Sequence, residues 1–480
     1  MTVKPAPRAV NAVKDRRPAK DVQIGPRIKR LRRQRGVSQA ALAGALGISA
    51  SYLNLIEHNR RRVTVDVLFR AAAYFGVEAG ELAESEEPRL AGDLMEVFGD
   101  DLFEGCDLTN QDIRDVATAH PTLGRAVLRL YDRYRALHEA AGRAPPAAAS
   151  GTVATDAVSD FLQQHANYFP QLEEAADRVR QQIDRASDSF EQGLRMHLHG
   201  AFGLQWRAAP LAGRAARQVD LGRSEIVTSD LLPGESAVFI VAQHLATLSA
   251  GAEIEAILAA SGLSPEAEPV ARNALTAYVA AGLMMPYDAF LAACKETRYD
   301  VERMERRFRA SFEQICHRMT TLQRPGRSGI PLHLVRTDIA GNISKRFSLS
   351  GIHIPRHSGA CPRWNVYGAF LQPERITVQV SQMPDGQRYL CLARAYARGG
   401  YRHNQPRRYL SLGLGCHVAF AGEMVYADGI DMANPELAVP IGVGCRQCPR
   451  LDCEQRAHPP AGHRIDLTDG ARAENFYTRA

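Results

Sequence analysis

The 480-residue sequence lacks the marks of an exported or membrane-spanning protein. It has no apolar signal-peptide segment near its N-terminus and no uninterrupted apolar run of about 18 residues. Its nine cysteines are few for this length, and without a signal peptide they favour a reducing compartment over a disulfide framework. The sequence therefore predicts a cytoplasmic protein without a membrane span.

The composition is that of a large globular protein, with 45% apolar and 23% charged residues, and the length suits several domains. The net charge of +6 is unevenly spread, because the first 35 residues hold 12 Lys or Arg and only two acids. We expect residues 1–20 to be a disordered basic tail that either attracts nucleic-acid phosphates or merely aids solubility.

Residues 24–75 carry the strongest local pattern in the chain. Apolar residues recur there at steps of three and four in four short segments, which predicts four helices. Ser38 and Ser49 precede two of these segments and can cap them, and Gly47 lies where a tight turn needs positive φ. Helix, glycine turn and helix form a helix-turn-helix, whose second helix enters the DNA major groove. The alternative is an ordinary small helical bundle.

This segment resembles the DNA-binding domain of the XRE (lambda-repressor-like) regulators. The matching residues are Gln39, Leu42-Ala43, Gly47-Ile48-Ser49, Tyr52-Leu53 and Ile56-Glu57. The resemblance implies a DNA-binding domain over about residues 21–83, with Ala50, Ser51 and Asn54 facing base edges and Ser38 and Gln39 near phosphate. An Asn side chain can both donate to and accept from adenine. The DNA-binding residues we expect are Ser38, Gln39, Ser49, Ala50, Ser51 and Asn54.

Residues 84–152 read as a helical linker. An acidic stretch from Glu84 to Asp107 is followed by a predicted helix over residues 111–140, and residues 141–152 are rich in Ala and Pro. The helix carries an apolar stripe at steps of three and four: Leu123, Val127, Leu130, Tyr134 and Leu137. This stripe can pair with its twin in a homodimer or pack against its own chain.

Residues 153–325 are mostly helical by pattern and resemble the zinc-metallopeptidase-like domain of ImmA/IrrE-type proteins. In that family a His-Glu-x-x-His helix holds zinc and activates water. Here the matching positions are Gln243, His244 and Thr247, which supply neither two histidines nor a carboxylate base. The resemblance therefore implies a retained fold without peptidase chemistry, in which His244 is a hydrogen-bonded core residue. The alternative, an active metallopeptidase that cleaves a repressor, lacks its motif.

The order of domains resembles the short-chain fatty acyl-CoA regulators of bacteria. The match includes TAYVAAGLMMPYDAFL and RYDVERMERRFRASFEQICHRMTTLQRPGRSGIP. The resemblance implies that acyl-CoA is sensed in the degenerate peptidase-like domain, since a pre-formed cleft suits a small ligand. Arg195 and Tyr278 are candidate ligand-binding residues by type and region only, and the alternative for each is a structural role.

Residues 326–480 change to strand patterns. Hairpins are predicted around 340–342 and at Asp385-Gly386, and residues 407–429 suggest another strand pair. A short helix is expected from Trp364 to Phe370. The predicted fold is thus multidomain and mainly α, with an N-terminal helix-turn-helix, a helical metallopeptidase-like middle domain and a C-terminal α+β domain built on an antiparallel sheet.

A cysteine cluster near the C-terminus carries the chemical signal of this last domain. Cys445, Cys448 and Cys453 are closely spaced, as metal-binding thiolates are. Cys361 is our fourth ligand, because it is the cysteine of the Gly-x-Cys-Pro-x-Trp segment in the similar regulators. Four thiolates suit a [4Fe–4S] cluster, which we place first, or structural zinc. The alternative is four unligated thiols.

These observations together predict a bacterial DNA-binding transcriptional regulator that senses short-chain acyl-CoA, acts as a homodimer on an operator and is not an enzyme. It would control genes of acyl-CoA and short-chain fatty acid metabolism. A redox- or iron-sensing transcription factor, with the cysteine cluster as its sensor, is the alternative of another class.

Overall fold

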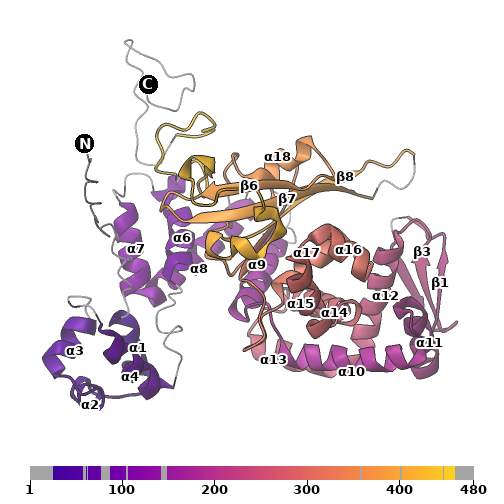
Figure 1. Cartoon of the computed structure of the whole chain (residues 1–480), viewed down its shortest axis with the longest axis horizontal. Helices are drawn as coiled ribbons and strands as arrows, with labels where there is room; N and C mark the ends of the chain where they lie inside the picture. Colours follow the sequence, from indigo (N-terminus) through magenta and orange to yellow (C-terminus); the bar gives the residue numbers. More distant parts are fainter. Residues whose placement is uncertain are drawn as a thin grey trace, which may run out of the picture. The chain divides into compact units, whose positions relative to one another are not determined.

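The computed structural model describes residues 25–57, 61, 63–76, 87–103, 106, 108–141, 149–213, 215–356, 359–399, 403–446 and 448–459 (Figure 1). The basic tail 1–20 and most of the Ala/Pro linker lie outside these ranges. The chain divides into two compact units, one made of residues 1–91 and 111–124 and the other of residues 92–110 and 125–480. The domain boundaries that we drew from the sequence stay predictions.

The first unit contains the four helices that the sequence predicts: α1 (Gly25–Gln34), α2 (Gln39–Ala45), α3 (Ala50–Glu57) and α4 (Val65–Phe75). Their buried core includes Ile28, Leu42, Leu53 and Ile56, which are the residues that set the helical period. Local signals also act as expected, since the Ser38 and Ser49 hydroxyls accept N–H groups of Ala41 and Tyr52.

Three helices follow along the chain: α6 (Glu87–Phe98), α7 (Asn110–Ala119) and α8 (Pro121–Ala141), with a short 3₁₀ turn η1 (Asp101–Phe103) after α6. The single helix expected over residues 111–140 is wrong, because the chain breaks between α7 and α8 at His120. Pro121 explains the break. It has no N–H to donate, it disfavours helical geometry in the preceding residue, and it is well suited to the first position of a new helix.

The middle of the chain is helical, as predicted, and adds a small sheet. Its helices are α9 (Ala149–Gln164), α10 (Pro170–Ala186), α11 (Phe190–Phe202), α12 (Gly234–Ser249), α13 (Gly251–Ser261), α14 (Glu268–Met284), α15 (Tyr287–Thr297), α16 (Val301–Phe308) and α17 (Phe312–Thr320). Strands β1 (Gln205–Ala209), β2 (Arg217–Asp220) and β3 (Glu225–Ser229) pair in the order β1-β3-β2. In Figure 1 this sheet lies beside α11 and α12. Helix α14 is buried over most of its length, so it forms the centre of the helical core.

A six-stranded sheet forms the C-terminal part. Its strands are β4 (Leu332–Asp338), β5 (Ile343–Ser348), β6 (Thr377–Gln382), β7 (Arg388–Arg398), β8 (Arg408–His417) and β9 (Ala438–Pro440), in the order β5-β4-β8-β7-β6-β9. All neighbours are antiparallel except β6 and β9, which are parallel and were not foreseen. The hairpins at 340–342 and at Asp385-Gly386 are confirmed.

The strand pair expected over residues 407–429 is wrong. Strand β8 is a single strand that pairs with both β4 and β7, and the chain then turns into the 3₁₀ helices η3 (Val418–Glu423) and η4 (Val425–Ala427). A third short turn, η5 (Pro435–Leu437), precedes β9. The predicted helix near Trp364 is present as α18 (Asn365–Gly368), continued by η2 (Ala369–Leu371).

Two glycines of β8 allow close packing on the sheet face that carries α18. A Cβ on Gly413 would lie 2.5 Å from Val366 Cγ1 of α18. A Cβ on Gly415 would lie 2.4 Å from the Leu390 carbonyl oxygen and 2.6 Å from the His333 ring. Both separations are below van der Waals contact, so the absence of a side chain at these positions lets a helix and a buried imidazole approach the strand.

No single helix in the described ranges has the length and apolar character needed to cross a bilayer; three sharply bent helix pairs reach that length and composition only when their two members are combined.

Candidate DNA-binding interface, ligand-binding domain and cysteine cluster

The helix-turn-helix is held together by a polar network around one buried carboxylate. Glu57, at the end of α3, accepts two hydrogen bonds from the Arg32 guanidinium of α1, at 2.6 and 2.9 Å. The Gln39 side-chain N–H₂ donates to Glu57 Oε2 at 3.0 Å and to Asn54 Oδ1 at 3.3 Å. Such paired bonds fix geometry well. The start of α2 therefore sets the orientation of α3 and of its Asn54 side chain.

The residues expected to face bases are available for contact. Ala50, Ser51 and Asn54 are all exposed on α3. Arg61, which sequence reasoning passed over, is also exposed, and its guanidinium lies 5.4 Å from the centre of the Tyr52 ring. A cation held against the recognition helix can contact phosphate. The signal that could have found it is the basic run that follows α3 in the sequence.

The degenerate peptidase motif lies on α12, as expected. The Gln243 amide donates to Asn273 Oδ1 at 2.9 Å and to Thr276 Oγ1 at 3.1 Å, so it links α12 to α14. The Thr247 hydroxyl donates to the Gln243 carbonyl oxygen within its own helix. The position of the first metal-binding His is thus used for a helix–helix contact.

His244 differs from our expectation of a hydrogen-bonded core residue. Its side chain is half-buried, and within the described part of the chain its Nε2 has no hydrogen-bond partner. Burial, with the nearby Arg217 charge, lowers the pKa of His244 below its ordinary value. A neutral imidazole is therefore favoured at this position.

A buried ion pair ties α10 to α17 in the helical core. Arg318 donates to both oxygens of Glu173, at 2.6 and 2.9 Å, and its Nε–H donates to the Met285 carbonyl oxygen at 2.9 Å. Both side chains are almost completely buried. Burial opposes the charge of Arg318, but the attraction and hydrogen bonds of Glu173 outweigh it and raise the pKa of the guanidinium.

Tyr278, one of the two expected ligand-binding residues, belongs to this ion-pair network. Its hydroxyl donates to Glu173 Oε1 at 2.7 Å and accepts the Phe169 N–H at 3.3 Å. Burial and the Glu173 charge raise the pKa of Tyr278 well above its usual value, so the phenol is neutral. The network was missed from the sequence, where Glu173 and Arg318 are 145 residues apart.

Arg195, the other expected ligand-binding residue, has structural contacts. Its guanidinium lies 3.8 Å from the centre of the Trp206 ring and donates to the Trp206 carbonyl oxygen at 2.6 Å. It also pairs with Glu191 one turn earlier in α11. Arg195 therefore joins α11 to β1, and it lies in a different network from Tyr278.

The cysteines predicted as metal ligands gather at one end of the six-stranded sheet. Burial raises the pKa of the Cys361 thiol, and Cys445 and Cys448 are close enough to raise it further. Burial also raises the pKa of the Cys448 thiol, and the nearby Cys453 raises it further. Among the described residues, however, no three His, Cys, Asp or Glu side chains are grouped closely enough to hold a metal ion as they stand. The donor set fits thiolate-bound metals, and the metal site stays a prediction.

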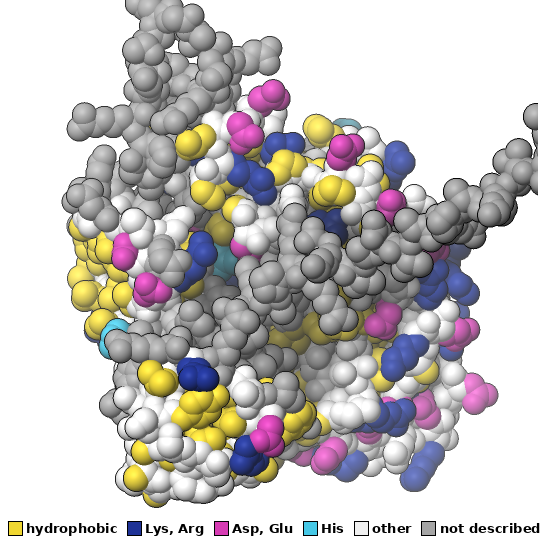
Figure 2. Space-filling view, turned by 60° about the vertical axis from the view of Figure 1, so that its left-hand side comes forward, with side chains coloured by type: hydrophobic (Ala, Val, Ile, Leu, Met, Phe, Trp, Pro, Cys, Tyr) yellow, Lys and Arg dark blue, Asp and Glu magenta, His cyan; other side chains and the backbone are white. Residues whose placement is uncertain are grey.

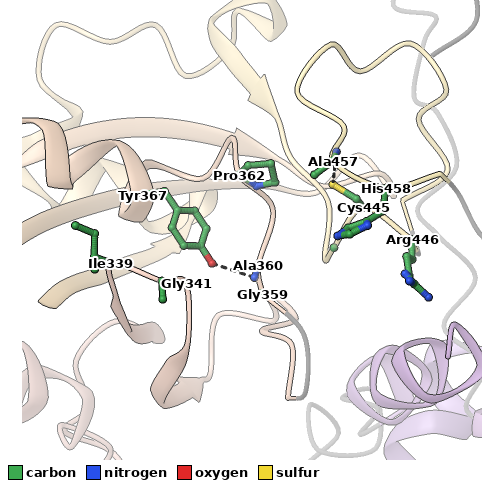
Figure 3. A pocket seen from close by; sticks show the side chains of 12 residues that line it. Ile339, Gly341, Gly359, Ala360, Pro362, Tyr367, Cys445, Arg446, Ala457 and His458 are labelled. Carbon is green, nitrogen blue, oxygen red and sulfur yellow. Dashed lines mark hydrogen bonds between the residues drawn. The ribbon is translucent and has the colours of Figure 1, made fainter. Parts of the chain in front are cut away.

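The Arg456 side chain holds the loop that carries Cys445, Cys448 and Cys453, named here the cysteine loop. It is buried, and its guanidinium donates to the carbonyl oxygens of Cys445 at 2.5 Å and Cys448 at 2.9 Å, and also to that of Arg450. The Ala457 N–H donates to Cys445 Sγ at 3.4 Å (Figure 3). The Arg456 charge acts on the Cys448 thiol and would offset part of the negative charge that ligation would create. The remaining cysteines Cys294, Cys316, Cys391 and Cys416 are buried, whereas Cys106 is exposed.

A pocket of about 390 Å³ lies next to the cysteine loop. Figure 3 shows Tyr367, Ile339 and Gly341 on one side and Cys445, Arg446 and His458 on the other. The Tyr367 hydroxyl accepts the Ala360 N–H at 3.0 Å, which holds the segment before Cys361 against this pocket. The pocket gives solvent a route to Cys445.

The comparisons with known proteins agree with this arrangement. Family models match residues 28–82 (helix-turn-helix), 204–320 (IrrE N-terminal-like domain) and 321–477 (short-chain fatty acyl coenzyme A regulator, C-terminal). The chain therefore combines a DNA-binding domain, a peptidase-like domain and the C-terminal domain of an acyl-CoA regulator.

The chain matches several transcriptional regulators over nearly their whole length. The chain is 39% identical to the HTH-type transcriptional regulator RamB of Mycobacterium tuberculosis, over 93% of this chain and 96% of RamB. It is 36% identical to PrpR of the same organism, over 95% of each chain. It is 35% identical to the propionyl-CoA carboxylase regulator of Cereibacter sphaeroides, over 95% of this chain and 98% of that protein.

A solved structure of a Mycobacterium tuberculosis transcriptional regulator has a TM-score of 0.65 and 37% identity, and the match covers 68% of this chain and 99% of that one. The chain belongs to the XRE-family short-chain fatty acyl-CoA transcriptional regulators. It is a DNA-binding transcriptional regulator of short-chain acyl-CoA metabolism.

Proposed function

We propose that this regulator senses a short-chain acyl-CoA, of the propionyl-CoA kind, and changes its affinity for an operator when the ligand binds. The observation that carries the proposal is the peptidase-like domain in which the first motif position, Gln243, links α12 to α14, while Thr247 bonds within its own helix. A peptidase-like fold that has lost its catalytic residues can still use its cleft to bind a ligand. The propionyl-CoA carboxylase regulator among the relatives supports the ligand class.

Thermal unfolding of the full chain with a panel of CoA esters tests this proposal. A ligand that binds only the folded state raises the unfolding midpoint by mass action, by an amount that grows with its concentration. We expect propionyl-CoA or a near homologue to raise the midpoint more than free CoA or long-chain esters. A midpoint unchanged by every short-chain ester would contradict acyl-CoA sensing.

Cys361, Cys445, Cys448 and Cys453 are proposed to hold a [4Fe–4S] cluster, with structural zinc as the alternative. The proximity of Cys361 to Cys445 and Cys448, and the bonds of the buried Arg456 to the carbonyls of Cys445 and Cys448, support a metal site. When bound, an iron–sulfur cluster would add redox sensitivity, which is the second candidate function. The chain's own contribution is to fix the loop through Arg456.

Metal analysis and absorption spectra of anaerobically purified protein test the cysteine site. A brown protein with iron and sulfide supports the cluster, and a colourless protein with about one zinc per chain supports structural zinc. Cys445→Ser, Cys448→Ser, Cys453→Ser and Cys361→Ser should each lose metal, whereas Cys391→Ser, a buried thiol elsewhere in the sheet, should not. Metal-free, folded wild-type protein that still binds DNA and acyl-CoA would remove the site from the mechanism.

The regulator is further proposed to act as a homodimer through α8. The apolar stripe that the sequence predicts on this helix is largely uncovered, with Leu130 71% and Leu137 72% exposed. Leu123 and Tyr134 are also exposed. These positions keep the alternating steps of four and three that pack two helices as a coiled coil. Exposed hydrophobic side chains among charged ones are a feature of the face drawn in Figure 2.

A second copy of the chain is the occupant that a helix-turn-helix protein needs, since two half-sites on DNA mirror a two-fold dimer. Leu130→Glu with Leu137→Glu should convert the dimer to a monomer in light scattering and weaken operator binding. Leu221→Glu, at an equally exposed leucine between β2 and β3, is the matched control. Wild-type protein that is monomeric at micromolar concentration, or a dimer that survives both charges, would contradict the α8 interface.

As a DNA-binding regulator it is proposed to work in the cytoplasm, where the chromosome of a bacterium lies, and to be no enzyme. The replacement of all three key peptidase residues supports the second point. Chelator-sensitive cleavage of a partner protein would overturn it.

A further inference from the structure

A cluster of basic side chains surrounds one carboxylate where α17 meets the six-stranded sheet. Glu313 of α17 is almost fully buried, and its Oε1 lies 2.6 Å from Arg336 of β4 and 3.3 Å from Lys345 of β5. Its Oε2 lies 2.7 Å from Arg398 at the end of β7 and accepts the Tyr396 hydroxyl at 2.8 Å. Three cations from three strands thus converge on a single anion, named here the Glu313 cluster.

The Glu313 cluster carries a surplus of positive charge. One carboxylate faces Arg336, Lys345 and Arg398, so two positive charges remain uncompensated. His317 adds none at neutral pH, because burial and Lys345 lower its pKa to about 4. Asp338, two residues beyond Arg336 on β4, is used by the β4–β5 turn, where it accepts the N–H groups of Ala340 and Asn342.

The strand register makes this surplus costly. Arg336 lies directly opposite Lys345, and Arg398 lies directly opposite Arg408. Like charges that face each other across antiparallel strands destabilise a sheet. Among the described residues, Arg408 has no carboxylate partner to offset the repulsion. Glu313 Oε1 lies between Arg336 and Lys345, so the repulsion without a carboxylate is the one between Arg398 and Arg408.

The cations are also partly open to solvent. Lys345 is 42% and Arg398 47% exposed at the side chain, whereas Arg336 and Glu313 lie beneath them. One nitrogen of the Arg398 guanidinium contacts Glu313, and the guanidinium has further N–H donors. A planar guanidinium beside an ammonium suits the oxygens of a phosphoryl group.

We propose that the Glu313 cluster is a binding subsite for a phosphoryl dianion. Two negative charges would match the two that the cluster leaves uncompensated, and they would offset the repulsion between Arg398 and Arg408. The phosphoryl group can belong to the coenzyme A part of the effector or to free phosphate. In the first case the inference rests on the proposed acyl-CoA function and names the residues that hold its phosphates.

Isothermal titration of the full chain with pyrophosphate tests the subsite. Lys345→Gln with Arg398→Gln removes the two exposed cations and should weaken binding at least tenfold. Arg307→Gln is the matched control, because Arg307 is equally exposed, pairs with one carboxylate, Glu296, and lies outside the cluster. Wild-type affinity in the double variant would overturn the subsite.

A variant of opposite sign separates binding from a structural role. Glu313→Gln keeps the shape of the side chain and removes the only carboxylate of the cluster, so it should tighten pyrophosphate binding several-fold. A purely structural ion-pair network would be weakened by all these changes and would show no gain in anion affinity. A loss of operator affinity in the Lys345/Arg398 variant, with pyrophosphate binding intact, would overturn the subsite and make this surface a DNA contact.

Coenzyme A and dephospho-coenzyme A distinguish the sources of the phosphoryl group. If the double variant binds coenzyme A and dephospho-coenzyme A more weakly than wild type, or binds the two with equal affinity, the effector supplies the phosphoryl group. If only pyrophosphate and phosphate bind more weakly, free phosphate is the ligand. Wild-type protein that binds pyrophosphate at the cluster but no CoA ester would refute the acyl-CoA function and leave the subsite standing.

Discussion

Replacing Arg318 by Met should be among the most destabilising single changes in the molecule. The guanidinium is completely buried, and its loss leaves the Glu173 carboxylate in the core with the Tyr278 hydroxyl as its one remaining side-chain donor among the described residues. Removing one partner of a buried ion pair costs about 3–5 kcal/mol of unfolding free energy, because the remaining charge is neither solvated nor paired. Met keeps much of the length of the side chain, so a cavity contributes little.

A second substitution tests the reasoning. Glu173→Leu in the Arg318→Met background removes the unpaired buried carboxylate and should restore most of the lost unfolding free energy. The double variant should stay about 1–2 kcal/mol below wild type, since the Met285 carbonyl and the Tyr278 hydroxyl lose partners worth about 1 kcal/mol each. Urea unfolding followed by circular dichroism measures all the variants. Arg307→Met, at an exposed ion pair, should cost under about 1 kcal/mol. A cost for Arg318→Met as small as this control, or a double variant less stable than either single one, would refute the account.

Three further predictions follow from local geometry. Asn54→Ala should weaken operator binding by about 1–3 kcal/mol in fluorescence anisotropy while leaving non-specific DNA binding unchanged; equal affinity would place the recognition surface elsewhere on α3. Gly415→Ala should destabilise the sheet by about 1–3 kcal/mol or more, because its Cβ meets a backbone carbonyl, whereas Gly422→Ala, with open space around it, should be neutral. His333 is buried, and desolvation lowers its pKa to about 3, so its imidazole is neutral in the folded protein. Between about pH 3 and about 6.5 this histidine is therefore protonated in the unfolded chain but not in the folded one. Stability should therefore fall as the pH drops below about 6.5, by about 2 kcal/mol at pH 5 from this group, and His333→Asn should reduce the dependence.

The sequence predicted best where short-range rules decide the structure. Capping hydroxyls at Ser38 and Ser49 and the glycine at position 47 act over three or four residues, so the helix-turn-helix could be read directly. The Asp385-Gly386 hairpin is local in the same way, and Gly386 has the positive φ that the turn requires. The break at Pro121 is equally local, and the proline that causes it was present in the sequence.

Long-range partners could not be predicted. Arg318 and Glu173 meet across 145 residues, and a buried Arg has no pattern of its own in the sequence. The strand β8 was read as half of a hairpin because residues 418–429 keep an apolar content, although they form 3₁₀ turns. The Glu313 cluster depends on strand register between β4 and β5 and between β7 and β8, which no single-sequence pattern fixes. Arg195 and Tyr278 were chosen by residue type alone, which could not predict that Arg195 contacts Trp206 or that Tyr278 bonds to Glu173.

The most direct test of acyl-CoA control is the affinity for operator DNA measured with and without a short-chain acyl-CoA at fixed salt, since phosphate contacts make the affinity salt-dependent. Allosteric coupling between the ligand and DNA should change the dissociation constant by roughly 5–150-fold, and the operator should in turn change the affinity for the ligand by the same factor. Asn54→Ala should lower operator affinity without changing ligand affinity. An operator affinity that no short-chain acyl-CoA alters, in protein that binds the ligand, would contradict the account.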